Sequence, residues 1–293
     1  MFIATLIAAR RISSGDISLA EDALRERGIE PMGRSWIEED KACDILFSAD
    51  PTIARDALEG MISGADLVVQ GEAGRRKRLL VADMDSTMIT VECIDELADY
   101  AGRKAEVAEI TERAMRGEID FTAALRDRVA LLKGLEEAVL DRCHDERVRI
   151  TPGARALVRT MRREGAYCLL VSGGFSAFAD RVAGAIGFDG AVANTLLVEE
   201  GRLSGTVGEP IVGAEGKLQA LIDAAEARAI ELGESLAIGD GANDIPMLKA
   251  AGLGVAYHAK PKVAAAADAR IEHGDVGALL FAQGYARSEW EAN

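Results

Sequence analysis

The sequence predicts an α/β fold: a doubly wound parallel Rossmann-like sheet with an inserted helical cap, preceded by a small ferredoxin-like α+β domain. Three observations lead to this prediction. From Leu79 onward, short and continuously apolar runs alternate with longer helical patterns, which is typical of a parallel sheet covered on both faces. Between Ile94 and Arg147 the patterns are helical only. Before residue 73 the order of patterns is strand, helix, strand, strand, helix, strand.

Residues 1–72 are expected to form the small domain. The apolar run from Phe2 to Ala9 indicates its first strand, and the Ser13–Asp16 segment can cap the helix that follows. Two strands, a helix and a last strand are then expected at 35–37, at 43–48, after Asp50-Pro51 and at 66–70. This order is that of a split βαβ, or ferredoxin-like, domain. The basic segment 75–78 that follows is expected to be a solvated linker.

The main domain is expected to begin at Leu79, because Leu79–Ala82 is apolar throughout, like a strand buried on both faces. Three later runs share this character: Tyr167–Val171, Leu236–Ile238 and Leu253–Ala256. Helical patterns at 152–164 and 215–232 separate them, and four helices, two of them at 104–115 and 121–133, are expected before the second run. We therefore expect a first domain at 1–72 and a core domain at 79–285, with a helical cap at about 93–150.

The charge balance restricts the class of partner. The chain has 293 residues, of which 49 are acidic and 34 basic, giving a net charge of −15. This argues against nucleic acid and anionic membranes as partners, but it permits a small anionic substrate in a locally positive site. The opening apolar run lacks a basic start and is too short to cross a bilayer, so we expect a strand and a cytoplasmic protein. A homodimer is left open.

Acidic residues follow two of the predicted strands, at the strand ends where ligands bind in open α/β sheets. Asp83 and Asp85 come directly after the first strand, and Asp240 and Asp244 follow the run that ends at Ile238. Two carboxylates two residues apart are costly there unless they share a cation or a proton. Hard oxygen ligands at two strand ends suit Mg²⁺. An Asp-x-Asp pair taken alone is also compatible with a polar loop.

Two further features are weak when taken singly. Ser172, Gly173 and Gly174 follow a third strand, where a hydroxyl and backbone amides at a helix start can hold an anion. A Gly-Gly pair by itself is more often only a turn. Lys217 lies near the start of a long helix, where a single lysine is usually solvated.

Taken together and in this order, the segments resemble the haloacid dehalogenase superfamily of phosphotransferases. Asp83-x-Asp85-x-Thr87, Ser172, Lys217 and Gly239-Asp240-x-x-x-Asp244 match its four signature motifs. Within the superfamily, the chain most resembles the members that hydrolyse phosphoserine. That resemblance is carried by Glu92, Ala114-Met115-x-Gly117, Asp120-Phe121 and the segments 125–134, 172–175 and 239–244. It covers about residues 79–285, and residues 1–72 are similar to the ACT-like leader domain of bacterial members.

The resemblance implies Mg²⁺-dependent hydrolysis of O-phospho-L-serine to L-serine and phosphate, the last step of serine biosynthesis, through an aspartyl phosphate. Asp83 would be the nucleophile, and Asp85 would protonate the leaving oxygen and then deprotonate water. Mg²⁺ would be held by Asp83, the backbone carbonyl of Asp85 and Asp240. Ser172 and Lys217 would stabilise charge on the transferred group.

The resemblance also implies how the substrate would be selected. Glu92 would bind the ammonium group, and Arg128 would bind the carboxylate, since a guanidinium binds a carboxylate bidentately. Taken alone, Glu92 is better explained as a surface charge and Arg128 as a charge on the face of a helix. Met115 and Phe121 would form an apolar wall. The other implied residues are Gly173, Gly174 and Asn243 in substrate binding, and Thr87 and Asp244 in support of the site.

Two alternatives remain open at this point. The first is a phosphatase or phosphotransferase of the same superfamily that acts on another small phosphate ester; residues 79–285 alone do not exclude it, but the Glu92 and Arg128 pair favours an amino-acid phosphate. A different class of function is a non-catalytic amino-acid sensor in which residues 1–72 are the working part. The complete set of Asp83, Asp85 and Asp240 argues against a sensor, which has no use for all of them.

Overall fold

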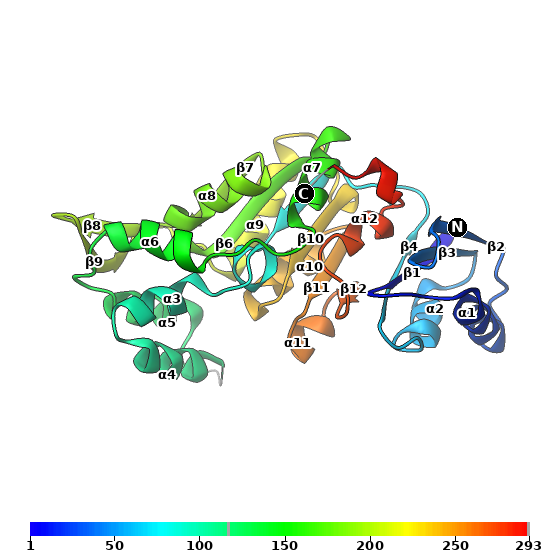
Figure 1. Ribbon diagram of the computed structural model, residues 1–293, viewed down its shortest axis with the longest axis horizontal. Coiled ribbons are helices and arrows are strands. Elements are labelled where there is room, and N and C mark those ends of the chain that lie inside the picture. Colours follow the sequence, from blue (N-terminus) through cyan, green and yellow to red (C-terminus); the bar gives the residue numbers. More distant parts are fainter. Residues whose placement is uncertain (116–117, 292–293) are drawn as a thin grey trace.

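The computed structural model, which describes residues 1–115 and 118–291 except the side chain of Met115, has the expected α/β architecture (Figure 1). Its main sheet has ten strands in the order β2-β3-β1-β4-β12-β11-β10-β5-β6-β7. One end of this sheet belongs to residues 1–72, called the leader below, and the other end to the core domain. The sheet therefore runs through both parts of the chain.

The leader has the predicted ferredoxin-like order. Its elements are β1 (Phe2–Ala8), α1 (Ser14–Glu26), β2 (Gly33–Glu38), β3 (Ala42–Phe47), α2 (Pro51–Leu58) and β4 (Ala65–Gly71). The four strands pair antiparallel, and the two helices pack on one face of them (Figure 1). The side chain of Ser13 accepts a hydrogen bond from the backbone N–H of Asp16, which confirms the expected helix cap.

The core domain is built on parallel strands at the expected places. These are β5 (Leu79–Ala82), β6 (Tyr167–Phe175), β10 (Ser235–Gly239) and β11 (Leu253–Tyr257). Two short parallel strands that were not predicted, β7 (Gly190–Asn194) and β12 (Ala269–Ile271), extend the row on either side. Alternate residues of β5 enter hydrophobic clusters on opposite faces of the sheet, which explains why the whole strand is apolar.

Helices cover both faces of the core sheet. One face carries α7 (Ala154–Arg163), α8 (Ser176–Ile186) and α12 (Ala278–Ala282). The other carries α9 (Ala214–Glu226), α10 (Ile245–Ala250) and α11 (Pro261–Ala264). Single turns are found at Leu232–Glu234, Ala242–Asp244 and Arg287–Glu289. This two-sided cover confirms the doubly wound arrangement.

The cap contains the four expected helices. They are α3 (Cys93–Tyr100), α4 (Lys104–Met115), α5 (Phe121–Ala130) and α6 (Ala138–Arg147). The helix predicted at 121–133 therefore ends three residues early, at Ala130. A hairpin of β8 (Leu196–Glu199) and β9 (Arg202–Val207) packs on α5 and was not predicted, because its strands are short and mostly exposed or half-buried.

The prediction of a solvated linker at residues 75–78 was wrong for Arg75 and Lys77, whereas Arg76 and Arg78 are exposed as expected. The guanidinium of Arg75 donates hydrogen bonds to the carboxylate of Asp44, the shorter at 2.6 Å, and to the carbonyl oxygen of Ala282 at 3.0 Å. The ammonium of Lys77 donates to the carbonyl oxygen of Gly233 at 3.0 Å. Because Asp44 lies in β3 and Ala282 in α12, Arg75 ties the leader to the core domain.

The leader also joins the core sheet directly. Leu67 of β4 pairs antiparallel with Arg270 of β12. Next to this pair, the buried carboxylate of Asp66 accepts hydrogen bonds from the backbone N–H groups of residues 272, 273 and 274 at 2.8, 3.0 and 2.8 Å. Beyond residue 285, the ring of Trp290 still packs on that of Phe281, with centroids 4.8 Å apart. The division at 1–72 and 79–285 stays a prediction.

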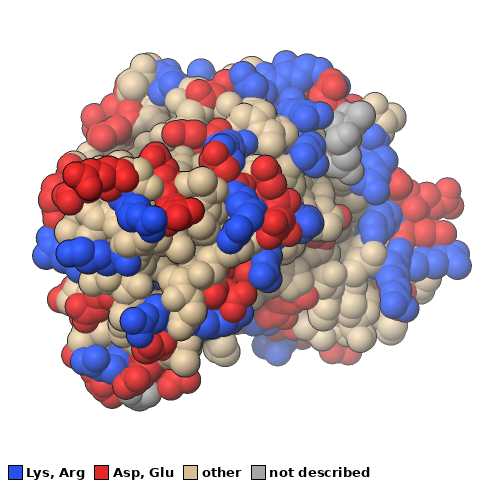
Figure 2. Space-filling model, turned by 60° about the vertical axis from the view of Figure 1, so that its left-hand side comes forward, with Lys and Arg blue, Asp and Glu red and all other residues tan. Residues whose placement is uncertain are grey.

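The surface and the cysteines agree with the composition. Figure 2 shows acidic and basic side chains intermixed over the face it draws, as expected of a solvated surface. Among the described residues, no helix combines the length and the apolar character that a membrane crossing needs. All four cysteines are free and buried.

Candidate active site

The predicted site residues meet at the carboxyl ends of β5, β6 and β10. A cavity of about 700 Å³ lies there between the sheet and the cap. Nine of the residues singled out from the sequence line it: Asp83, Asp85, Glu92, Phe121, Arg128, Gly173, Gly174, Asp240 and Asn243. Position alone explains this, because neighbouring parallel strands end at one edge of the sheet and the cap follows β5 in the chain.

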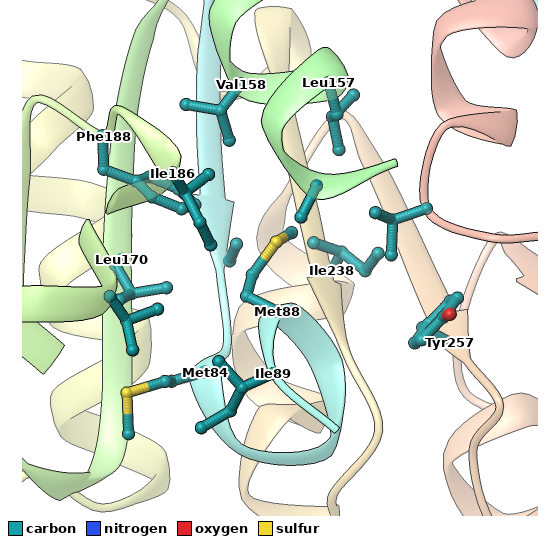
Figure 3. Close-up of a cluster of buried hydrophobic side chains, with 14 of the residues drawn as sticks. Met84, Met88, Ile89, Leu157, Val158, Leu170, Ile186, Phe188, Ile238 and Tyr257 are labelled. Carbon is teal, nitrogen blue, oxygen red and sulfur yellow. The ribbon is translucent and has the colours of Figure 1, made fainter. Parts of the chain in front are cut away.

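The turn after β5 presents Asp85 to the cavity. Residues Met84–Met88 form a wide turn, closed by the hydrogen bond from the N–H of Ile89 to the carbonyl oxygen of Met84 at 3.0 Å, with non-helical backbone at Asp85 and Ser86. Met84, Met88 and Ile89 are buried in the hydrophobic core, among side chains of α7, β6 and β10 (Figure 3). Their burial anchors the turn, and Asp85 and Ser86 line the cavity instead. Burial of Met84 and Met88 therefore holds Asp85 and Ser86 in position at the cavity wall.

Lys217 is the buried cation of the site. Its ammonium nitrogen lies 2.5 Å from Oδ1 of Asp83 and 2.7 Å from Oδ1 of Asp244. Burial disfavours the ammonium, but Asp244 and Asp83 outweigh it and raise the pKa of Lys217. Burial and then the carboxylate of Asp244 raise the pKa of Asp83, and Lys217 acts against both. A single lysine near a helix start is usually solvated, but Lys217 is fully buried and paired, so that interpretation is wrong for Lys217.

The acidic side chains at this point fit a divalent cation. Asp83, Asp240 and Asp244 each offer a carboxylate oxygen, and these atoms lie within 4.8 Å of one another. Burial and Asp244 raise the pKa of Asp240 to about 6. The oxygens of Asp244 already accept hydrogen bonds from Lys217 and from the N–H of Gly241 at 2.9 Å. Asp83 and Asp240 therefore keep the more available oxygens, and a cation between them would relieve their repulsion.

Thr87 and Asp244 hold these carboxylates in place. The hydroxyl of Thr87 donates to Oδ1 of Asp240 at 2.9 Å, and both Thr87 and Asp244 are fully buried. A side chain at Gly239 would place its Cβ 2.4 Å from the carboxylate of Asp244, so only glycine fits at that point. This arrangement agrees with the supporting roles that the resemblance implies for the two residues.

Asp85 is suited to proton transfer. Its Oδ1 accepts a hydrogen bond from the backbone N–H of Cys93 at 3.0 Å, and its Oδ2 lies 3.5 Å from the hydroxyl of Ser172. Burial and then the charge of Glu92 raise the pKa of Asp85 to about 7. A carboxyl group with a pKa near neutrality can both give and take a proton at working pH.

The glycines after Ser172 permit a close approach of backbone to the acidic groups. A Cβ at Gly174 would lie 2.5 Å from Oδ2 of Asp85, and one at Gly173 would lie 3.1 Å from the ring of Phe121. The hydroxyl of Ser172 accepts from the N–H of Gly174 at 2.8 Å. Any larger residue at 174 would displace Asp85, so the Gly-Gly pair is more than a turn here.

Glu92 and Arg128 face the cavity from the cap side. Oε1 of Glu92 accepts a hydrogen bond from the hydroxyl of Ser86 at 2.6 Å. The Nε of Arg128 donates to the carbonyl oxygen of Ala124 at 3.2 Å within α5. Burial lowers the pKa of Arg128, whereas Asp95 and Glu92 act to raise it. The cavity thus carries both charges at its cap end, together with the ring of Phe121. The predicted wall residue Met115 lies outside the described side chains.

Comparison with known proteins places the chain in a family. Residues 80–249, more than half of the chain, match the haloacid dehalogenase-like hydrolases. The chain belongs to this family. The matched segment contains the acidic cluster, the cap and the buried lysine, so the family assignment and the geometry concern the same residues.

Several named relatives of this hydrolase are similar over most of its length. A phosphoserine phosphatase of Polaromonas sp. is 48% identical over 69% of this chain and 88% of that protein. A phosphoserine phosphatase of Streptomyces coelicolor is 46% identical over 80% of this chain, which spans only 58% of the length of that protein. A crystal structure of a hydrolase of the same family from Salmonella enterica has a TM-score of 0.84 at 29% identity, covering 96% of this chain and 98% of that one.

Three residues of the hydrolase's site region were not predicted. Asn194 is buried at the end of β7, and its side chain donates to the carbonyl oxygen of Gly173 at 2.9 Å and accepts from the N–H of Val212 at 2.7 Å. It ties the segment after Ser172 to the one before α9. Ser86 and Asp95 line the cavity. A polar residue ending the apolar run 190–194 was the only available signal for Asn194.

Proposed function

We propose that this hydrolase cleaves O-phospho-L-serine to L-serine and phosphate, with Mg²⁺ as cofactor and an aspartyl phosphate as intermediate. The observation that carries the proposal is one cavity that joins the Asp83/Asp85 pair to the opposite charges of Glu92 and Arg128. The relatives named phosphoserine phosphatases, at 46% and 48% identity, support the same substrate.

In the proposed first step, a carboxylate oxygen of Asp83 bonds to phosphorus while the bond from phosphorus to the ester oxygen breaks. Asp85 gives its proton to that oxygen, so that serine leaves as the neutral alcohol. The pKa of Asp85, raised to about 7 by burial and by Glu92, supports this donor role. The Lys217 ammonium, 2.5 Å from Oδ1 of Asp83, opposes the rise in the pKa of Asp83 and so favours the ionised nucleophile.

In the proposed second step, Asp85 removes a proton from a water molecule whose oxygen bonds to phosphorus. The bond between phosphorus and the Asp83 oxygen breaks, which releases phosphate and restores the carboxylate. Ser172 and Lys217 are proposed to stabilise charge on the transferred group. The hydroxyl of Ser172 lies 3.5 Å from Oδ2 of Asp85. Asn243 lines the same part of the cavity and is proposed to orient the phosphate.

A bound Mg²⁺ would supply charge neutralisation between the nucleophile and the phosphate. Asp83, Asp240 and the backbone carbonyl of Asp85 are proposed to hold it. The close oxygens of Asp83 and Asp240, and the hydrogen bond that Thr87 makes to Asp240 at 2.9 Å, support this set. Mg²⁺ is preferred over larger cations because one or two carboxylates with water and phosphate suit its octahedral coordination.

Substrate choice is proposed to arise at the cap end of the cavity. Phosphoserine carries an ammonium and a carboxylate group beyond its ester bond. Glu92 has a carboxylate held toward the cavity, and Arg128 has a guanidinium that binds a carboxylate bidentately. Phe121, and Met115 by family resemblance, are proposed to close the apolar side. The prediction of a cytoplasmic location belongs to the same proposal; it is supported by the pairing of the first apolar run as β1 between β3 and β4. A homodimer stays open.

Phosphate release over a panel of esters tests the proposal. We expect phosphoserine to give the highest kcat/KM among phosphoserine, phosphothreonine, glycerol phosphate and p-nitrophenyl phosphate. Replacing the nucleophile in Asp83→Asn is expected to lower turnover by at least about 10³-fold, because an amide does not form the acyl phosphate. A higher kcat/KM for another ester would favour the alternative substrate class. Turnover within tenfold of wild type in Asp83→Asn would exclude the covalent mechanism.

A further inference from the structure

Ser86 stands next to the group proposed to recognise the substrate amine. Its hydroxyl donates to Oε1 of Glu92 at 2.6 Å, and both side chains line the cavity. The backbone of Ser86 has φ of 55°, in the left-handed region that residues other than glycine rarely adopt. A strained backbone that persists at a cavity wall is a feature of functional sites.

The surrounding turn imposes this conformation. Met84 and Met88, on either side of Ser86, are fully buried in the core beneath the turn (Figure 3). The N–H of Ile89 bonds back to the carbonyl oxygen of Met84 at 3.0 Å, and the N–H of Ser86 bonds to the carbonyl oxygen of Val91 at 3.3 Å. The turn therefore folds back on itself and delivers the hydroxyl of residue 86 to residue 92.

The carboxylate of Glu92 is available to the hydroxyl of Ser86 because it does not cap its own helix. It occupies the N-cap position of α3, yet its side chain makes no capping hydrogen bond. The first N–H of the helix, that of Cys93, donates instead to Oδ1 of Asp85 at 3.0 Å. Asp85 therefore accepts the hydrogen bond from the first N–H of the helix. The carboxylate of Glu92 is not used for capping, and the hydroxyl of Ser86 donates to it instead.

A single hydroxyl fixes the carboxylate without consuming it. Ser86 donates to Oε1 of Glu92 only, so Oε2 stays able to accept from a ligand in the cavity. A glutamate side chain otherwise loses considerable rotamer freedom when it binds a ligand, and a pre-formed hydrogen bond reduces that loss.

We propose that Ser86 is a positioning residue that sets the preference of this cavity for phosphate esters carrying a protonated amine, by orienting Glu92. The inference rests on the proposed function, since it assigns the origin of specificity within that site. A purely structural role for Ser86 would change turnover of every ester alike, whereas positioning of Glu92 changes turnover only of esters with the amine.

The test compares phosphoserine with 3-phosphonooxypropanoate, which keeps the phosphate ester and the carboxylate and lacks only the amine. The measured quantity is the ratio of kcat/KM for the two esters. We expect Ser86→Ala to lower this ratio by about tenfold, as for loss of one hydrogen bond to a charged group. Ser86→Gly, which relieves the left-handed backbone, should lower it similarly if the hydroxyl is responsible. Ser288→Ala, at an exposed serine, is the matched control.

A double-mutant cycle completes the test. In a Glu92→Ala background, Ser86→Ala should change the ratio by less than about twofold, because the carboxylate that Ser86 orients is absent. A wild-type enzyme that does not prefer phosphoserine overturns both the proposed function and this inference. A wild-type preference that survives in Ser86→Ala and Ser86→Gly, or equal losses for both esters, overturns only the role of Ser86. Thermal denaturation of each variant shows that it is folded.

Discussion

The ammonium nitrogen of Lys217 lies 2.5 Å from Oδ1 of Asp83, although the two residues are 134 positions apart in the chain. The Lys217 side chain has no exposed surface and that of Asp83 is 9% exposed. The same nitrogen lies 2.7 Å from Asp244, so one buried cation serves two buried carboxylates. Removing one member of such a group leaves uncompensated charge in the interior.

We expect Lys217→Met to lower the free energy of unfolding by about 3–5 kcal/mol, because Asp83 and Asp244 then stay buried without their cation. Urea unfolding of the metal-free protein measures this loss. Lys249→Met, at an exposed lysine of α10, is the matched control and should stay within about 0.5 kcal/mol of wild type. A stability equal to that of the control would show that the ion pairs contribute nothing net.

Removal of divalent metal with EDTA is expected to abolish phosphate release, and added Mg²⁺ to restore it. The reason is the repulsion among Asp83, Asp240 and the substrate phosphate, which Lys217 alone does not neutralise. Ca²⁺ should restore activity poorly, because it takes more ligands at longer distances. Full turnover in chelator would remove the metal from the mechanism.

Arg128→Ala is expected to lower kcat/KM for phosphoserine by about 30- to 1000-fold, since a buried carboxylate of the substrate would lose its charged partner. The loss for p-nitrophenyl phosphate should be much smaller, because that ester has no carboxylate. Arg128→Lys should recover only part of the loss, since an ammonium lacks the bidentate geometry. Arg126→Ala, which removes an exposed arginine two positions away that pairs with Glu209, is the control. Equal losses for both esters would assign Arg128 to the phosphate or to folding.

Asp66→Asn is expected to lower the free energy of unfolding by about 1–3 kcal/mol. The neutral amide replaces a carboxylate that accepts three backbone hydrogen bonds from residues 272–274. Asp56→Asn, at an exposed position of α2, should have little effect. Unfolding in urea followed by circular dichroism compares the two. A loss no greater than that of Asp56→Asn would show that the leader docks without help from this carboxylate.

The sequence was sufficient for the leader strands, for the four main core strands and for most of the residues that meet at the ends of those core strands, because local patterns encode both. Leu79–Ala82 is apolar at every position since both faces of β5 are buried, and Asp83 and Asp85 follow it at once. The role of Asn194 could not be predicted from the sequence, because it depends on contacts with Gly173 and Val212 that no local pattern encodes. The hairpin β8–β9 was missed for a different reason: its strands adjoin in the sequence, but they are short and mostly exposed or half-buried, so they lack a clear apolar pattern.

The junction after residue 72 shows a second kind of failure. A run of arginine and lysine is normally solvated, and charge alone predicted a linker there. Arg75 is instead only 16% exposed, since Asp44, 31 residues earlier, and Ala282, 207 residues later, supply its partners. Likewise, the left-handed backbone of Ser86 follows from the burial of Met84 and Met88 on the far side of the turn.

The pairing of Leu67 with Arg270 has a consequence for self-association of the chain. Without β4, strand β12 would end the core sheet and present unpaired backbone groups to other molecules. Exposed strand edges of this kind are templates for aggregation, and proteins commonly cover them. The leader therefore covers one edge of the core sheet, and β12 and β11 separate it from β10, β5 and β6, whose ends form the cavity.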